Sequence, residues 1–268
     1  MNTIIQQGKR SNQHLRQPVV LIGVGEMAGV FARGLLRIDC PLVPVTRHMD
    51  IDTVADTAPD AALVLVTVAE DDLQPVLEKM PRVWRDRIGL LQNELLPRNW
   101  EAYDVAAPTV IVVWFEKKKG QEYKVIIGSY AYGASAELMV QALRSLDIPC
   151  QALDSESELV FELVRKNVYI LTINIAGLVT GGTVGELWQQ HRVLAQQVAE
   201  EIIEIQAWLT GAALAQARLI AGMLEAIAAD PGHRCTGRSA PARLVRALRD
   251  ADAAGLAVPT LRTIAARR

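Results

Sequence analysis

The segment from residue 19 to residue 38 constrains the fold of this 268-residue chain more than any other part of the sequence. It opens with Val-Val-Leu-Ile at residues 19–22, and continuous branched apolar runs of this kind are typical of strands buried on both faces of a parallel sheet. A turn containing two glycines follows, and helical periodicity then runs from Met27 to Ile38. A strand, a glycine turn and a helix in this order predict the first unit of a doubly wound α/β sheet.

The glycine turn itself has the pattern G-x-G-x-x-A. In such a turn the first glycine permits the tight bend, the second lets phosphates approach the backbone, and the small last residue lets helix and strand pack closely. The phosphate charge then lies at the helix N-terminus, where backbone N–H groups point outward. The setting therefore favours a dinucleotide-binding turn over a purely structural one, and its residues are Gly23, Val24, Gly25, Glu26, Met27 and Ala28.

The rest of the sequence divides into a mixed half and a helical half. Apolar runs of strand length recur at 42–45, 61–68, 88–91, 109–114 and 125–128, with helical patterns at 70–80 and 134–146. From residue 156 onward the pattern is helical, with segments at 194–209, 212–229 and 241–254. We therefore predict a Rossmann domain over 18–152 and an all-α substrate and dimerisation domain over 153–268, after a disordered lead-in at 1–17.

Composition narrows the classes of partner. The formal net charge is −2, which gives no basic excess for nucleic acid or acidic membranes, and no apolar run is long enough to span a bilayer. The three cysteines lie far apart without a C-x-x-C pair, and the four histidines show no metal-ligand spacing. We expect a cytoplasmic protein without a metal, nucleic-acid or membrane partner. The apolar helices of the second half favour a homodimer.

The end of the second apolar run bears on the choice of cofactor. Arg47 follows it about twenty residues after the glycine turn, where NAD enzymes tend to carry an acidic residue for the ribose and an arginine suits the 2′-phosphate of NADP. We expect NADPH, with Arg47, His48 and Val68 beside it. A solvated Arg47 is the alternative, and Asp50 and Asp52 leave NAD open as the less favoured cofactor.

Several short segments give the chain a family resemblance. They are the glycine turn, Leu-Gln-Asn at 91–93, the pattern K-x7-N from Lys166 to Asn174, and Gly-Arg-Ser at 237–239 with Gly-Leu-Ala-Val-Pro at 255–259. Together they resemble ketopantoate reductases, which pair a Rossmann domain with a helical domain like that of 6-phosphogluconate dehydrogenase. The resemblance implies that Lys166 is the general acid, that Asn93 lies beside the nicotinamide ribose or the substrate, and that Asn174 binds the substrate.

The chain also departs from that family at three positions. Glu94 stands where the family has glycine, Ile170 replaces a second helix asparagine, and Ala240 replaces a glutamate. Glu94 would repel a carboxylate substrate unless a cation pairs with it. These departures leave three activities open: reduction of a small 2-oxo acid, a related reduction of an imine or turnover of a 3-hydroxy acid, and a binding-only sensor that has lost catalysis.

The residues of the lysine helix support a site independently of the resemblance. Lys166 and Asn174 are eight residues apart, which places them near one face and about 12 Å apart along the axis. A partly desolvated lysine can donate a proton to a developing alkoxide. The alternatives are that Lys166 is solvated and paired with Glu158 or Glu162, and that Asn174 is a buried amide bonded to neighbouring backbone.

Overall fold

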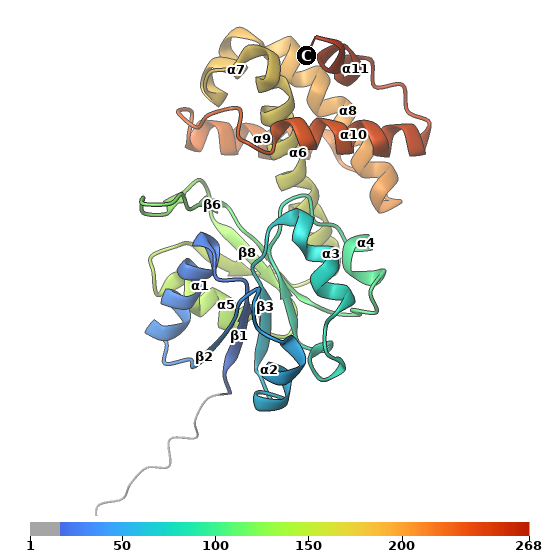
Figure 1. The fold of residues 1–268 in the computed structure, drawn as a ribbon. Helices are drawn as coiled ribbons and strands as arrows, with labels where there is room; N and C mark the ends of the chain where they lie inside the picture. Colours follow the sequence, from blue (N-terminus) through green and yellow to red (C-terminus); the bar gives the residue numbers. More distant parts are fainter. Residues whose placement is uncertain (1–16, 268) are drawn as a thin grey trace, which may run out of the picture.

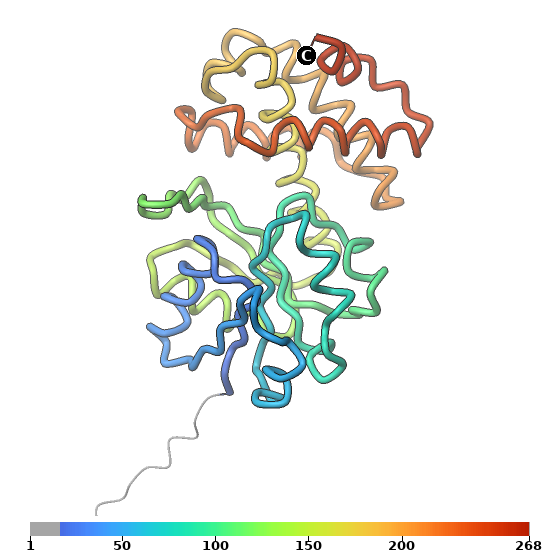
Figure 2. The backbone as a smooth tube through the Cα atoms, viewed as in Figure 1, coloured from blue at the N-terminus to red at the C-terminus, as the bar shows by residue number. Residues whose placement is uncertain are grey.

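A computed structural model describes residues 17–267. The lead-in predicted for residues 1–17 lies, except for Gln17, outside the described residues. Figures 1 and 2 show an α/β half and a helical half stacked on each other, with α6 leading from one into the other. This arrangement confirms the predicted Rossmann sheet followed by an all-helical half.

The α/β half is built on a seven-stranded sheet in the order β2-β1-β3-β4-β5-β8-β9. Every neighbouring pair is parallel except β5 and β8. Because β2 and β3 flank β1, the connections reverse direction there, and the crevice for a ligand opens outside the carboxyl ends of β1 and β3. The strands are β1 (Val19–Ile22), β2 (Leu42–Val45), β3 (Leu63–Val66), β4 (Ile88–Leu90), β5 (Thr109–Val112), β8 (Ser129–Tyr132) and β9 (Cys150–Ala152).

Alternating residues of the strands build two separate cores. Val19 and Leu21 face α1 (Glu26–Arg37) and α5 (Ala136–Arg144), whereas Val20 and Ile22 face the opposite side of the sheet. That opposite side is covered by α2 (Ile51–Thr57), α3 (Glu70–Glu78), the short helix η1 (Arg82–Trp84), α4 (Arg98–Glu101) and part of α6. The continuous apolar runs of β1 and β3 thus follow from burial on both faces.

The helical half is organised around α6 (Glu156–Thr180). Ser155 caps its start by accepting a hydrogen bond from the backbone of Glu158, and Gly181, with φ of +64°, ends it. It packs against β5 and β8 as well as against the helices beyond. The remaining helices are α7 (Val184–Gln190), α8 (Arg192–Thr210), α9 (Gln216–Ala229), α10 (Ala240–Ala254) and α11 (Pro259–Ala266).

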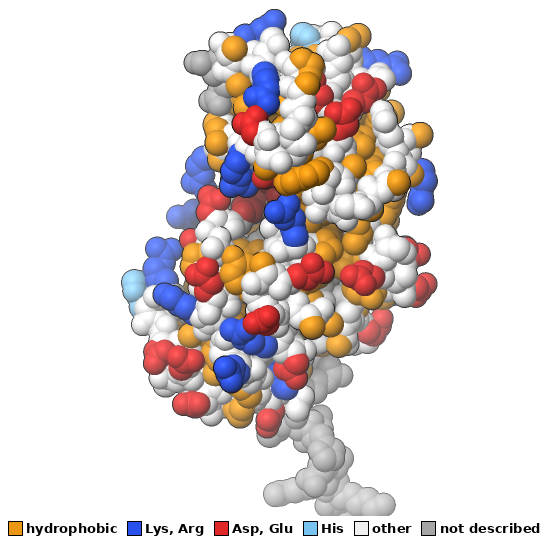
Figure 3. All heavy atoms as spheres, turned by 90° about the vertical axis from the view of Figure 1, so that its right-hand side faces the viewer, with side chains coloured by type: hydrophobic (Ala, Val, Ile, Leu, Met, Phe, Trp, Pro, Cys, Tyr) orange, Lys and Arg blue, Asp and Glu red, His pale blue; other side chains and the backbone are white. Residues whose placement is uncertain are grey.

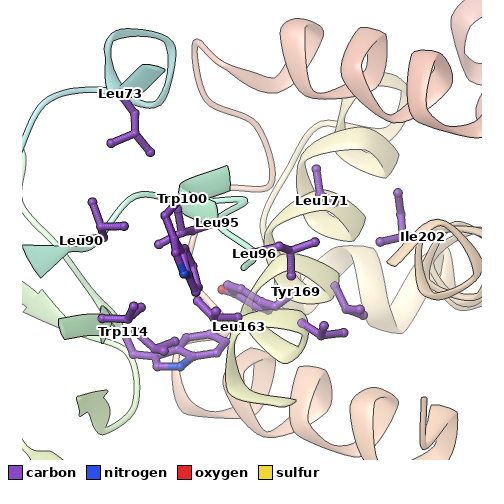
Figure 4. Close-up of a cluster of buried hydrophobic side chains, with 14 of the residues drawn as sticks. Leu73, Leu90, Leu95, Leu96, Trp100, Trp114, Leu163, Tyr169, Leu171 and Ile202 are labelled. Carbon is purple, nitrogen blue, oxygen red and sulfur yellow. The ribbon is translucent and has the colours of Figure 1, made fainter. Parts of the chain in front are cut away.

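The core on the α6 side continues from the sheet into the helical half. Figure 4 shows Leu90, Trp100 and Trp114 of the α/β half facing Leu163 and Tyr169 of α6. All of these side chains are buried. The two halves therefore share one apolar core on this side of the sheet.

The predicted strand at 125–128 is wrong in most of its length. Only Val125 of this run lies in a strand, because β7 (Lys124–Val125) pairs with β6 (Phe115–Glu116) in a separate two-stranded sheet. The main sheet is instead extended by β8, which begins at Ser129, and by β9. Figure 1 shows the β6 segment projecting toward the helical half.

The surface matches the balanced composition. On the face shown in Figure 3, acidic and basic side chains are interspersed. Among residues 17–267, no helix combines the length and the apolarity that crossing a bilayer requires.

Candidate active site

The glycine turn is held in a conformation that brings its backbone to the crevice. Gly23 has φ of +89°, and a Cβ atom there would meet Val68 at 3.0 Å. The Thr67 hydroxyl donates to the carbonyl oxygens of Ile22 (3.0 Å) and Gly23 (2.7 Å). A larger residue at Gly23 would be strained and crowded, so this glycine serves the close turn that the sequence predicted.

The N-terminus of α1 has the properties of an anion-binding site. Gly25 precedes the helix, supplies no side-chain cap, and has open space where a Cβ would stand. The first-turn N–H groups therefore remain available to a ligand. Glu26 adds a negative charge at this end, but Lys117 pairs with its carboxylate at 3.0 Å. The turn thus fits the phosphates of a dinucleotide.

Two adjoining clefts open at this edge of the sheet. The first, about 830 Å³, runs from the glycine turn to Thr46–Met49, with Arg47 and His48 on its wall. The second, about 790 Å³, shares Gly25, Arg47 and Val68 with the first and extends between the two halves of the molecule. The sequence-predicted residues that line one or both clefts are Gly23, Val24, Gly25, Glu26, Met27, Arg47, His48, Val68, Asn93, Lys166 and Asn174.

One predicted residue lies outside both clefts. Ala28 is buried in α1, in the core between this helix and the sheet. Its small side chain lets the helix lie close to β1, which is the packing role that the pattern assigns to the last position of the turn.

Lys166 is the most unusual charged residue of the second cleft. The residue is only 4% exposed, and among the described residues it has no hydrogen-bond or ion-pair partner. Burial lowers its pKa from 10.5 to about 8, with the charge of Glu70 opposing this shift and that of Arg243 adding to it. An ammonium group with this pKa is suited to proton transfer near neutral pH.

The glutamates expected as alternative partners of Lys166 are engaged elsewhere in the described part of the chain. Glu162 is bound by Arg165 at 3.2 Å, and Arg165 also contacts Glu225 at 2.7 Å. Glu158 turns back to accept a hydrogen bond from the backbone of Asp154 at 3.0 Å. Lys166 therefore faces the cleft instead of pairing along its own helix.

The two predicted asparagines are fixed by the protein. Asn174 donates to the carbonyl oxygen of Cys235 at 3.0 Å and accepts from Arg243 at 2.6 Å. Its amide thus bonds to neighbouring backbone, as the structural alternative expected, while also lining the cleft. Asn93 donates to Glu70 Oε1 at 2.7 Å.

A network of charged residues that the sequence analysis did not identify joins the two halves. Arg243 of α10 donates to Glu94 at 2.9 Å and to Glu70 at 3.3 Å. Arg246 donates to the same Glu94 carboxylate at 2.6 and 3.1 Å. The burial of Glu70 opposes its ionisation, but the hydrogen bond from Asn93 and the nearby cations prevail and hold its pKa below the ordinary value.

Glu94 occupies a position that favours glycine. Its φ is +59°, in the left-handed region, at the place where the resemblance expects a glycine. The two arginines neutralise the charge that would otherwise repel an anionic substrate, which meets the condition set in the sequence analysis. The same ion pairs anchor the strained residue.

One periodic signal marked Arg243 in the sequence. Ala240, Leu244, Ala247 and Ala251 form the buried stripe of α10, and Arg243 lies on it. A charged residue on an apolar stripe requires partners. Glu70 carried no comparable signal, because acidic residues in the first turn of a helix are common.

The comparisons with known proteins bear on the fold. No family model matches the chain, and no curated protein sequence matches it. A probable 2-dehydropantoate 2-reductase from Bacillus subtilis is similar in structure, with a TM-score of 0.66 and 17% identity over 92% of this chain and 97% of that one. A dimeric ketopantoate reductase from Staphylococcus aureus has a TM-score of 0.64 and 15% identity, covering 92% and 96% of the two chains.

A second kind of enzyme has a similar structure. A D-mandelate dehydrogenase in a ternary structure with NADH and anilino(oxo)acetate has a TM-score of 0.62 and 12% identity, covering 92% of this chain and 96% of that one. At these identities the likeness establishes that the chain has the fold of these reductases and dehydrogenases over nearly its whole length.

Proposed function

We propose that the chain is an NADPH-dependent oxidoreductase that reduces a small 2-oxo acid to the hydroxy acid. The observation that carries this proposal is Lys166, a buried cation without a partner among residues 17–267, on the wall of a cleft that continues into the glycine-turn cleft. An unpaired buried charge is destabilising, and such groups in a cleft are concentrated at functional sites.

The proposed chemistry divides between cofactor and protein. NADPH, when bound, would supply hydride to the substrate carbonyl carbon. Lys166 donates a proton to the carbonyl oxygen as negative charge develops there. Asn93 and Asn174, which line the same cleft, orient the substrate. The side chains of the second cleft also exclude water from the reacting atoms.

The residues of the first cleft support the cofactor assignment. Gly23 and Gly25 form the tight turn, and the N-terminus of α1 would lie against the phosphates of the bound cofactor. Arg47 is exposed on the cleft wall, and we assign it to the 2′-phosphate that distinguishes NADPH. The similar D-mandelate dehydrogenase carries NADH in its structure, so NADH is the competing cofactor in the test below.

Apolar lining favours a substrate with an apolar side chain. Trp114, Tyr169 and Ile170 line the second cleft, and Ile170 stands where the resemblance expects an asparagine. The anilino(oxo)acetate of the D-mandelate dehydrogenase structure is a 2-oxo acid derivative with an aromatic group. We therefore place 2-oxo acids with aromatic or branched side chains beside ketopantoate as the first candidates.

We extend the proposal to the domain organisation of the chain, its oligomeric state and its location in the cell. We propose a Rossmann domain over 18–152 and a substrate and dimerisation domain over 153–268. The similar ketopantoate reductase from Staphylococcus aureus is dimeric, which supports a homodimer. A cytoplasmic location fits a reductase that draws on the NADPH pool.

Nucleotide binding is the first experiment. Titration with NADPH and NADH, followed by fluorescence, is carried out on the unmodified chain, on Arg47→Ala and on Arg82→Ala, an exposed arginine outside both clefts. We expect NADPH to bind more tightly than NADH. Arg47→Ala should weaken NADPH binding tenfold or more, about 1.4 kcal/mol, and leave NADH binding nearly unchanged.

A 2-oxo acid screen with Lys166→Met as control completes the test. Loss of turnover in that variant with NADPH affinity retained is the expected result. NADPH binding without turnover of any carbonyl would favour a sensor, and turnover only with amines present would favour imine reduction. Failure of both nucleotides to bind would reject the oxidoreductase function itself.

A further inference from the structure

The start of α10 lacks the carboxylate that the resemblance leads one to expect. Ala240 occupies that position, and the first turn of α10 contains no acidic residue. The second cleft nevertheless contains a partly buried carboxylate, and it comes from the opposite half of the molecule. Glu70, in the first turn of α3, reaches the cleft beside Lys166 and Arg243.

Glu70 is held in place by donors from two further elements. Its Oε1 accepts from Asn93 at 2.7 Å, in the turn after β4, and from Arg243 at 3.3 Å, on α10. Its side chain is 28% exposed, and the contacts fix it at the junction of the two halves. The carboxylate is therefore positioned by the fold rather than free to rotate in solvent.

Three carboxylates line the second cleft, those of Glu26, Glu70 and Glu116. Although Arg243 pairs with Glu70 at 3.3 Å, Glu70 is the carboxylate among them whose charge acts on Lys166. Glu26 and Glu116 line the cleft, but Lys117 and Lys118 pair with them, each at 3.0 Å. Glu94 lies outside the lining of this cleft and is engaged by two arginines.

The cations Arg47, Lys117 and Arg238 also line the cleft, together with two titratable groups that are neutral. Burial raises the pKa of Tyr169 and lowers that of His233, so both are uncharged near neutral pH. Arg243, on α10, adds a positive charge that disfavours the ammonium form of Lys166. The charge of Glu70 opposes both this repulsion and the effect of burial.

We propose that Glu70 is a positioning residue that keeps Lys166 in its ammonium form in the cleft. The effect of the Glu70 charge on the protonation of Lys166 is argued from the cleft itself. The consequence for catalysis rests on the proposed function. Because Glu70 belongs to the α/β half and Lys166 to α6, the proton donor is completed across the junction of the two halves.

The decisive variant is Glu70→Gln, which preserves shape and removes the charge. The protonation of Lys166 is measured without any substrate, from the pH dependence of its acetylation by acetic anhydride, quantified on the Lys166 peptide by mass spectrometry. Only the neutral amine reacts, so the midpoint reports its pKa. The matched control is Glu78→Gln, which removes an exposed carboxylate from the same helix.

We expect the acetylation midpoint in Glu70→Gln to fall by about one pH unit, the lower end of the effect of a close opposite charge. Glu78→Gln should keep the midpoint of the unmodified chain, and Glu70→Asp, which retains a carboxylate, should lie nearer to it than Glu70→Gln does. Circular dichroism at each pH verifies that the variants are folded. If Glu70→Gln proves unstable, the acetylation midpoint of Glu70→Asp is compared with that of the unmodified chain instead. We expect the midpoint of Glu70→Asp to be the lower of the two.

An unmoved or rising midpoint in the folded variants overturns the proposal, whether or not the chain reduces 2-oxo acids. A falling midpoint in a chain without reductase activity supports the charge coupling and rejects the proposed function alone. Where turnover is found, the alkaline decline of kcat/KM should move to lower pH together with the acetylation midpoint, while NADPH affinity stays constant.

Discussion

At the scale of single residues, the buried charge of Lys166 lowers the stability of the fold and is the group to which we assign proton donation. Its ammonium group is buried without a partner in the described part of the chain, and its folded-state pKa of about 8 lies below its ordinary value of 10.5. The unfolded chain therefore holds this proton more tightly than the folded chain does. The destabilisation is fully present below pH 8 and is relieved as the pH rises from about 8 toward 10.5.

Lys166→Met should accordingly raise the midpoint of thermal unfolding at pH 7 while abolishing reduction. Methionine fills similar space without a charge to desolvate. The gain should shrink between pH 8 and pH 10, as the unmodified lysine loses its proton. Differential scanning fluorimetry across this pH range checks the prediction, with Lys119→Met, at an exposed lysine, as control. A variant less stable than the parent at pH 7 would contradict it.

Glu94 combines backbone strain with ion pairing, and two substitutions separate these effects. Glu94→Gly and Glu94→Gln both remove the carboxylate that Arg243 and Arg246 share. Only glycine relieves the left-handed conformation at φ of +59°. We expect Glu94→Gly to be more stable than Glu94→Gln by about 1 kcal/mol in urea unfolding. Equal stabilities would show that the turn stores no such strain.

The sequence predicted cleft-lining residues that belong to local patterns, and it missed the charged residues that meet across the fold. The glycine turn is recognisable because strand, turn and helix are consecutive. The contact between Glu70 and Arg243 joins residues 173 positions apart. The apolar stripe of α10 indicates that Arg243 needs a partner, but nothing in the sequence near it names Glu70 as that partner. Their proximity depends on how the halves pack, which no local spacing specifies.

At the scale of elements, buried parallel strands were predictable and the edge of the sheet was not. β1 and β3 are continuous apolar runs buried on both faces. β8 reads Ser-Tyr-Ala-Tyr, with alternate residues only half-buried, and β9 has two exposed residues out of three. Short strands of this kind lack the apolar run that identified the others, so the pairing of β8 with β5 and of β9 with β8 decides their state.

The close approach of α6 to the loop before α10 gives a prediction at this scale. A Cβ at Gly177 would lie 2.5 Å from Cys235 Cβ and 2.9 Å from Thr236, next to the Cys235 carbonyl that Asn174 binds. Gly177→Ala should push this loop outward, destabilise the fold by about 1–3 kcal/mol and weaken substrate binding by displacing Asn174.

A second helical glycine provides the control for Gly177→Ala. Gly29 lies in α1, and a Cβ atom there would have open space within 4 Å, so Gly29→Ala should gain helix propensity and stabilise by up to about 1 kcal/mol. Chemical denaturation of both variants measures the contrast. Two stabilising substitutions would mean that α6 and the loop are less tightly packed than the structure indicates.

At the scale of the whole molecule, the two halves are joined by both apolar packing and charge. The apolar cluster includes Val20 and Val66 from the sheet, Val164 from α6 and Ile202 from α8 without interruption. The ion pairs of Arg243 and Arg246 with Glu70 and Glu94 close the same junction on the cleft side. Separation of the halves would expose part of the core and leave these charges unpaired.

Because the core on the α6 side of the sheet includes residues of both halves, we expect the chain to unfold in one cooperative transition despite its two architectures. Pulsed hydrogen exchange along a urea series, read by mass spectrometry, follows β1 and β3 separately from α8 and α9. Their midpoints should coincide, and the calorimetric and van't Hoff enthalpies should agree. Arg246→Met should lower both midpoints together, since its ion pair to Glu94 spans the junction. An early transition confined to the helical half would show instead that α6 is a linker between independent domains, and the site residues on α6 and α10 would then not be held against Glu70 by the fold.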